Sequence, residues 1–372
     1  MSMISRLSEH IHSVPYIDVS DLQDYSVNTN IAKLSGIKKL IESCFILISG
    51  TSPTSTTGDS VSGSNNNTST TSNNNNNNNK VIQYTASSVM LPPMDHEYNG
   101  HIMSLDGDKC SLLSLATSKW TSIQDVIKRP YNYVPTSVVY ARGDVYVFGG
   151  PDAPNTYSRF SLAEKQCYDD DIFGIIGCTF ASACFDGNRL IYLVGGNHQG
   201  HKSDRVDCFN IDTQQFSSVG TLPHGLAFPC IYYHNNAIIV VGGEKAGGGG
   251  GGSHTEVLLF NVRTHVTDVL IKDISISQYD FSCFDGEDNI YVHAKDGFMR
   301  YTLSTKQPTK LSRCPTYGQL RQMVYDRSVG IICLGGKGNN YRYTTQDDHW
   351  TRLNDDDPVA NRTWYGACLI RD

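Results

Sequence analysis

The chain lacks the long apolar runs and the positive charge that would suit a membrane or a nucleic acid. No run of 18 apolar residues, the length that spans a bilayer as a helix, occurs in its 372 residues. The formal net charge is −7, and no basic stripe is present to neutralise phosphates. We therefore expect neither a membrane nor a nucleic acid among its partners.

Paired-cysteine motifs are also absent. The 11 cysteines are scattered, and none has C-x-x-C spacing, so the sequence contains neither a zinc-ribbon nor a redox motif. The first residues, MSMISRLSEH, include no apolar segment of the kind that directs secretion. We expect a cytoplasmic protein with reduced thiols and without a cofactor.

Residues 1–95 are interpreted as an extension that precedes the main domain. A short helix is predicted by apolar residues at steps of three and four, namely Ile31, Leu34, Ile37, Ile41 and Phe45. The alternative for this segment is an oligomerising stub. Residues 51–79 are rich in Ser, Thr, Asn and Gly and end in seven consecutive asparagines, which predicts a disordered insert.

In the remainder of the chain, four apolar segments each end in a pair of glycines. These pairs are Gly149-Gly150, Gly195-Gly196, Gly242-Gly243 and Gly335-Gly336, and the first three are 46 and 47 residues apart. A period of about 40 to 50 residues with several short strands per unit is typical of a β-propeller. Glycine permits strained backbone conformations and close backbone contacts, so we assign the glycines a structural role.

A second pattern places two bulky residues seven positions apart around a polar turn. The clearest pairs are Phe209 with Phe216 and Tyr343 with Trp350. Weaker pairs are Tyr84 with Leu91, Leu113 with Trp120, Phe160 with Cys167, Phe260 with Thr267, and Tyr301 with Pro308. Each pair predicts a hairpin whose bulky ends pack between neighbouring sheets. Trp120 and the four residues of the clearest pairs are therefore assigned to the core.

Together these two patterns resemble kelch repeats. In those repeats a glycine pair ends the second strand of a blade, an aromatic residue lies in the third, and a tryptophan follows in the fourth. The resemblance covers about residues 100–372 and extends weakly to 41–91. It implies an all-β, kelch-type β-propeller, to which we assign residues 96–372. Two features depart from it: the tryptophan occurs only at Trp120 and Trp350, and Asp106-Gly107 and Ala294-Lys295 replace the glycine pair.

The spacing between repeats predicts the number of blades. Only 11 residues separate Leu91 from Ile102, whereas 25 separate Trp120 from Val145, so one strand is missing before Ile102. Residues 363–370 have the position of a first strand with no second strand after it. Pairing them with residues 101–107 would close the ring and remove two exposed sheet edges. This arrangement predicts six blades, and seven is the alternative if residues 41–91 form a blade.

Two histidine groups and two acidic runs are candidates for chemistry. The histidine groups are His198 with His201, and Asp95-His96 with His101. Neither group has a third and a fourth ligand nearby in sequence, so we predict no metal site. Asp169–Asp171 and Asp355–Asp357 are interpreted as solvated loop charges, and no catalytic residue is predicted.

Recognition is expected on the loops of one face. The loops after the second strand of each blade and those between blades emerge on the same face, where propellers bind peptides or partner loops. The predicted partner-binding residues are Asp152, Asn155, His198, His201, Lys202, Lys337, Asn339 and Asn340.

From these features we expect a non-catalytic protein-interaction module or scaffold. The kelch resemblance implies two alternatives. One is a galactose-oxidase-like or isomerase-type enzyme with its site in the central pocket, where such oxidases hold copper through tyrosine and histidine. The other is the substrate-recognition subunit of a ubiquitin ligase, although the first 90 residues show no pattern of the BTB, F-box or zinc-binding modules found in such relatives. A stoichiometric metal in the purified protein would favour the enzyme.

Overall fold

The computed structural model describes residues 97–124, 126–128, 133–247, 252–316 and 321–371. The helix predicted within 31–45, the insert 51–79 and the hairpin at Tyr84 and Leu91 lie outside these described residues. All the described residues belong to the unit Ser87–Asp372. Every regular element in them is a β-strand, so the described fold is all-β.

The described residues contain six four-stranded antiparallel sheets. From the inner to the outer strand, the first sheet contains β29 (Gly366–Ile370), β1 (His101–Asp106), β2 (Lys109–Ser114) and β3 (Trp120–Ile123). The second contains β4 (Val138–Ala141), β5 (Asp144–Phe148), β6 (Thr156–Ser161) and β7 (Gln166–Asp171). The third contains β8 (Ser182–Phe185), β9 (Leu190–Val194), β12 (Arg205–Asn210) and β13 (Gln215–Thr221).

The other three sheets follow the same order from the inner strand outward. The fourth contains β15 (Cys230–His234), β16 (Ala237–Val241), β19 (Val257–Asn261) and β20 (Thr267–Ile271). The fifth contains β21 (Phe281–Phe284), β22 (Asn289–Ala294), β23 (Gly297–Thr302) and β24 (Gln307–Leu311). The sixth contains β25 (Met323–Asp326), β26 (Gly330–Cys333), β27 (Tyr341–Thr344) and β28 (His349–Arg352).

Two small sheets are built from the connections. The hairpin of β10 (Asn197–His198) and β11 (His201–Lys202) follows β9. The second small sheet joins β14 (Leu226–Ala227), β17 (Glu244–Lys245) and β18 (Gly252–Ser253) in that order. It therefore ties the connection between the third and fourth sheets to the loop that follows β16.

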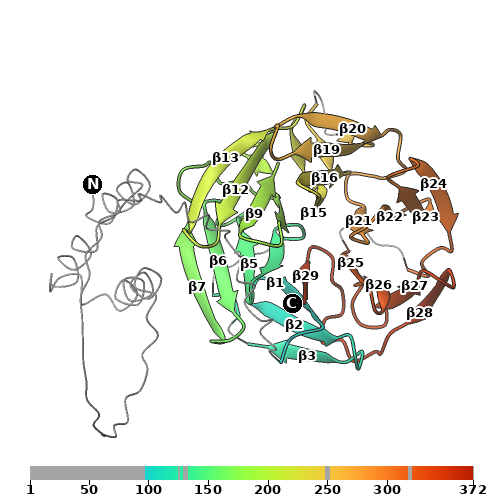
Figure 1. Cartoon of the computed structure of the whole chain (residues 1–372). Coiled ribbons are helices and arrows are strands. Elements are labelled where there is room, and N and C mark those ends of the chain that lie inside the picture. Colours follow the sequence, from blue (N-terminus) through green and yellow to red (C-terminus); the bar gives the residue numbers. More distant parts are fainter. Residues whose placement is uncertain (1–96, 125, 129–132, 248–251, 317–320, 372) are drawn as a thin grey trace, which may run out of the picture. The chain divides into compact units, whose positions relative to one another are not determined.

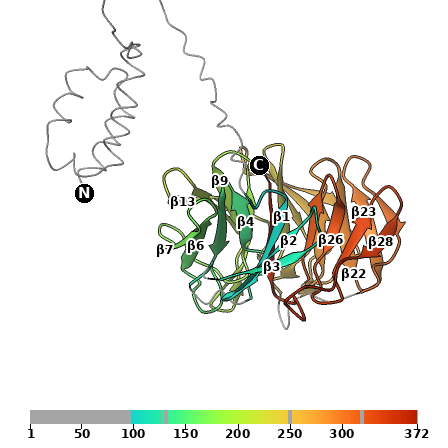
Figure 2. The ribbon, with the colours of Figure 1, turned by 90° about the horizontal axis from the view of Figure 1, so that it is seen from below.

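The six large sheets are arranged around a common centre (Figure 1). Each inner strand lies against the inner strand of the next sheet, in the order β29, β4, β8, β15, β21, β25 and back to β29. Figure 2, turned by 90°, shows the sheets side by side around this centre. This arrangement is compatible with a propeller.

Burial falls from the middle of each sheet to its outer edge. All five residues of β16, with the sequence AIIVV, are buried, whereas only one of the six residues of β7 is. A strand covered by neighbouring sheets on both faces has to be apolar on both faces. This explains why the segments before the glycine pairs are almost continuously apolar, and it places the core between adjacent sheets.

The outer hairpins match the seven-residue pattern. Six of the predicted pairs are direct cross-strand partners, namely Leu113–Trp120, Phe160–Cys167, Phe209–Phe216, Phe260–Thr267, Tyr301–Pro308 and Tyr343–Trp350. The rings of Phe209 and Phe216 have centroids 4.7 Å apart, and those of Tyr343 and Trp350 are 5.0 Å apart. The prediction of these hairpins is confirmed.

The C-terminal strand completes the first sheet. β29 pairs antiparallel with β1, so that Gly366 faces Leu105 and Ile370 faces His101. Pairing of the last strand with the segment after residue 100 is therefore confirmed. The two segments that form this edge lie at opposite ends of the described chain.

The paired glycines are buried, and Gly149, Gly195, Gly196, Gly242, Gly243 and Gly336 lie against the connections between sheets. A Cβ atom at Gly196 would lie 2.6 Å from the Cβ of Cys178, and one at Gly243 would lie 2.8 Å from the carbonyl oxygen of Ala227. Both glycines have a left-handed backbone, with φ of 99° and 96°. Any side chain here would meet both a steric clash and backbone strain.

Candidate functional site

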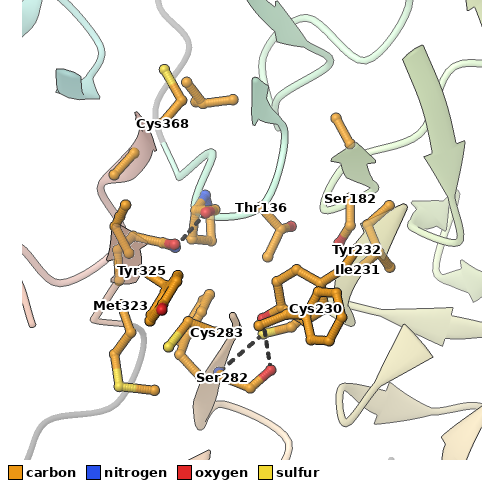
Figure 3. A pocket seen from close by; sticks show the side chains of 18 of the residues that line it. Thr136, Ser182, Cys230, Ile231, Tyr232, Ser282, Cys283, Met323, Tyr325 and Cys368 are labelled. Atoms are coloured by element: carbon orange, nitrogen blue, oxygen red, sulfur yellow. Dashed lines mark hydrogen bonds between the residues drawn. The ribbon is translucent and has the colours of Figure 1, made fainter. Parts of the chain in front are cut away.

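A cavity of about 250 Å³ lies at the centre of the sheets and is lined by residues of all six inner strands. Figure 3 shows Thr136, Ser182, Cys230, Tyr232 and Tyr325 among the side chains around it. Hydroxyls, thiols and apolar side chains therefore share its wall. No histidine, lysine, arginine or carboxylate belongs to this lining among the described residues.

The ionisable groups of the cavity are neutral at physiological pH. Burial raises the pKa of the Tyr232 hydroxyl and of the Cys283 thiol well above their usual ranges. Burial also raises the pKa of Cys230, Tyr325 and Cys368. The thiols are therefore protonated and poor nucleophiles, and the cavity offers uncharged hydrogen-bonding groups.

Hydrogen bonds hold the inner strands together around the cavity. The Thr136 hydroxyl donates to the carbonyl of Ala181 at 3.1 Å, and the hydroxyls of Tyr232 and Ser282 lie 2.9 Å apart. The side-chain amide of Gln322 donates to the carbonyl of Pro135, which joins the sixth sheet to the second. The wall is thus fixed by contacts between different sheets.

Five aromatic side chains gather where the inner strands begin. We call this group, formed by Tyr133, Phe180, Phe228, Tyr279 and Trp364, the axial aromatic cluster. Ring centroids are 4.3 Å apart for Phe180 and Phe228, 5.7 Å for Phe228 and Trp364, and 5.3 Å for Tyr133 and Trp364. Each member precedes cavity-lining residues by one to three positions, so the cluster lies at one end of the cavity.

The backbone of the cluster is strained. The φ values are 57° at Tyr133, 59° at Phe180, 56° at Phe228 and 73° at Trp364, a region that bulky residues seldom adopt. Strained backbone persists where the surrounding structure holds it, and it is concentrated at functional sites. Tyr133 is 48% exposed and Phe228 only 6%, so the cluster runs from the surface into the core.

The sequence carries a signal for this cluster that the repeat patterns described above do not include. Phe180, Phe228, Tyr279 and Trp364 each lie two residues before the first residue of β8, β15, β21 or β29. An aromatic residue therefore recurs at one position in four of the six repeats. The glycine pairs and the outer hairpins define the period of the repeats, but neither pattern includes the position two residues before the inner strand.

The predicted partner-binding residues lie in the loops that follow the glycine pairs, at the end of the sheets where the inner strands begin. Asp152, Asn155 and His201 are exposed. His198 is half-buried, and its Nδ1 lies 3.2 Å from the carbonyl oxygen of Gly177. Lys202 is also half-buried and forms an ion pair of 3.1 Å with Glu244. The exposed members remain candidates for contact with a partner.

The predicted partner-binding residues after Gly335-Gly336 differ in how far they are buried. Lys337 is exposed and Asn339 is half-buried, but Asn340 is only 1% exposed. The Asn340 side chain accepts hydrogen bonds of 3.0 Å from the amides of Gly335 and Gly336 and donates one to Asp357. Asn340 therefore supports the glycine pair and presents no side chain to a partner in this structure.

The acidic run Asp355–Asp357 was interpreted as solvated loop charges, and for Asp357 this interpretation is wrong. Asp355 and Asp356 are exposed, but Asp357 is 2% exposed and forms a bidentate ion pair with the fully buried Arg362. Arg362 also donates to the hydroxyls of Ser104 and Ser111, and its guanidinium lies 3.8 Å from the centre of the Trp120 ring. The pair joins the connection before β29 to the first sheet.

Another polar group lies outside the cavity lining. His224, His254 and Glu256 place their ligand atoms within 4.8 Å of one another. Burial lowers the pKa of His254 to about 4, so its ring is neutral at pH 7. No sequence motif connects these residues, because 30 positions separate the two histidines.

No protein-family model matches this chain, and no curated protein matches it. In the described part of the chain, no helix has the length and apolar character needed to cross a membrane.

Proposed function

We propose that residues 97–371 form a six-bladed, kelch-type β-propeller that is closed by β29. The six four-stranded sheets, the cyclic order of their inner strands and the Arg362–Asp357 pair support this proposal. Contact between β25 and β29 favours six blades over seven, because a blade from residues 41–91 would have to separate these strands.

Closure is tested by removing residues 363–372. We expect this deletion to expose the edge of β1 and to abolish cooperative unfolding. A second variant moves the same residues to between positions 96 and 97, which keeps the strand beside β1 because Ile370 faces His101. We expect this variant to fold. Circular dichroism melts compare the thermal unfolding of the wild type, the deletion variant and the variant with the transposed strand. A fully stable deletion variant would contradict closure.

We further propose that the propeller is a non-catalytic binding module that receives an extended segment of a partner protein at the axial aromatic cluster. The single observation that carries this proposal is the convergence of five aromatic side chains, four on left-handed backbone, at the start of the inner strands. Aromatic residues supply much of the energy of protein interfaces. Their backbone strain is consistent with side chains positioned for binding.

The chemistry of the cavity favours binding over catalysis. Its thiols and tyrosines are neutral because burial opposes their charged forms. The copper chemistry of the galactose-oxidase alternative uses histidine together with tyrosine, and the described lining offers tyrosine alone. A neutral wall with hydroxyls suits the backbone and side chains of a peptide.

The binding proposal is tested with a Phe180→Ala/Trp364→Ala variant of the full chain. Affinity capture from native extract identifies the segment that the wild type binds, and titration with a synthetic copy of that segment measures affinity. We expect binding at least tenfold weaker in the variant. Tyr168→Ala is the matched control, because Tyr168 is an exposed aromatic residue on the outer strand β7.

Three results would each change the proposal. Equal binding by the double variant would remove the cluster from the site. Loss of binding only after residues 197–203 and 337–340 are replaced by Gly and Ser would move the site to the glycine-pair loops. Turnover of a primary alcohol by the purified protein would favour the oxidase alternative.

A further inference from the structure

A group of three metal-ligand side chains is assembled by the small sheet of β14, β17 and β18. His224 lies two residues before β14, and His254 follows directly after β18. Because β17 pairs with both strands, it brings these two histidines together across 30 positions of sequence. The amide of His254 also donates to the carbonyl of Gly243 at 2.9 Å, which fixes its position beside a glycine pair.

The distances in this group suit a small divalent cation. Nε2 of His224 and Nδ1 of His254 are 3.2 Å apart, and the ligand atoms of all three residues lie within 4.8 Å of one another. Two nitrogens bound at about 2.0–2.1 Å to one tetrahedral Zn²⁺ would lie about 3.3–3.4 Å apart. The two nitrogens therefore have nearly the separation that one ion requires, and the carboxylate of the half-buried Glu256 lies within 4.8 Å of them.

His254 is almost fully buried and presents its Nδ1 atom to the group. The residue is 1% exposed, and its Nε2 atom, on the other edge of the ring, has no hydrogen-bond partner. An ion bound by Nδ1 would leave Nε2 as it is. The approach of the ligand atoms of His224, His254 and Glu256 to one another therefore carries the inference.

We propose that His224, His254 and Glu256 form a Zn²⁺ site on the face that carries the glycine-pair loops. Two imidazoles and one carboxylate are a donor set that Zn²⁺ accepts while leaving a fourth position for water or a side chain of a partner. The ion joins the connection before β15 to the loop after β16. Lys245 on β17 acts electrostatically on both rings and opposes the ion, whereas the charge of Glu256 favours it.

The site is distinct from the central cavity, because none of its three residues belongs to the cavity lining. Zinc bound here does not supply the central copper chemistry of the oxidase alternative. The site is also separate from the axial aromatic cluster, since no member of that cluster is one of its three ligands.

The experiment is equilibrium dialysis of the full chain against micromolar ZnCl₂, followed by metal analysis and by Co²⁺ absorption spectroscopy to report tetrahedral coordination. We expect one Zn²⁺ per chain and a melting temperature that rises with Zn²⁺. His224→Ala, at a half-buried position, should weaken binding at least 100-fold, and Glu256→Gln at least tenfold. Melting curves recorded without metal test whether both variants fold.

The matched control is His198→Ala/His201→Ala, which removes the other histidine pair near the glycine-pair loops and should leave binding unchanged. Lys245→Gln should strengthen binding, because it removes the opposing charge. Absence of stoichiometric Zn²⁺ from the wild type, equal binding by His224→Ala, or loss of binding in the His198/His201 variant would each overturn the proposal.

Discussion

The two ends of the sheets use the same unusual backbone conformation for different purposes. At the hairpin end, where third and fourth strands connect, every one of the six described hairpins has a left-handed residue five positions after its first bulky residue. These residues are Ser118, Lys165, Gln214, His265, Lys306 and Asp348, with φ between 47° and 59°. At the loop end, which carries the glycine pairs and the connections between sheets, the left-handed residues include four members of the axial aromatic cluster.

The two ends differ in the role of the side chains that the left-handed residues carry. At the hairpin end the left-handed residue closes a turn, and serine, lysine, glutamine, histidine and aspartate all occur there. At the loop end the same conformation directs bulky rings toward one another, as in Phe180 and Phe228 with centroids 4.3 Å apart. The left-handed residue of the turn therefore occurs in all six repeats, whereas the aromatic residue two positions before the inner strand occurs in four of them.

The largest effect is expected from Arg362→Leu at the loop end. This change leaves the buried carboxylate of Asp357 without its partner, and breaking a buried ion pair costs about 3–5 kcal/mol of unfolding free energy. Arg352→Leu is the control, because the Arg352–Asp355 pair is half-exposed and contributes about 0–1 kcal/mol. Urea unfolding measures both, and equal losses would contradict the role of Arg362 as a buried link.

A smaller effect is expected when valine replaces one glycine at each end. Gly187, in the turn between β8 and β9, has φ of 78°, and a Cβ atom added to it would meet nothing within 4 Å. Gly243 has φ of 96°, and a Cβ atom added to it would have backbone atoms within 3.0 Å. Both variants acquire backbone strain of about 1–3 kcal/mol, and Gly243→Val adds a steric clash. Thermal melts should rank Gly243→Val below Gly187→Val, and equal melting temperatures would show that backbone strain alone governs these positions.

The smallest effect is expected from Gln214→Gly at the hairpin end. Glycine removes the strain of the left-handed residue but increases the entropy of the unfolded chain, so unfolding free energy should change by less than about 1 kcal/mol. Phe180→Gly relieves the same strain but removes an aromatic ring, so it should weaken binding of the partner segment. If both changes were neutral in stability and binding, the two ends would be equivalent.

Much of the fold could be predicted because its signals are local. The seven-residue spacing from Phe209 to Phe216 is a property of one hairpin, and it reappears as direct cross-strand pairing. The apolar segment before Gly242 is buried along its whole length, since both of its faces are covered. The acidic run at 355–357 was less predictable, because its third member meets an arginine five positions later, and that arginine binds two serines more than 250 positions earlier.

The all-β class, the period of the repeats, the outer hairpins and the need for glycine after the second strands could all be read from the amino-acid order. These features follow from strand alternation, turn geometry and backbone sterics, which act over fewer than about ten residues. Which distant residues meet became visible only in the folded chain: the five rings of the axial aromatic cluster, the His224–His254–Glu256 group, and Arg362 with Ser104 and Ser111. Each of these groups depends on contacts between sheets or between connections. The axial aromatic cluster leaves a partial trace, an aromatic residue two positions before four of the inner strands, whereas the other two groups leave no fixed spacing in the sequence.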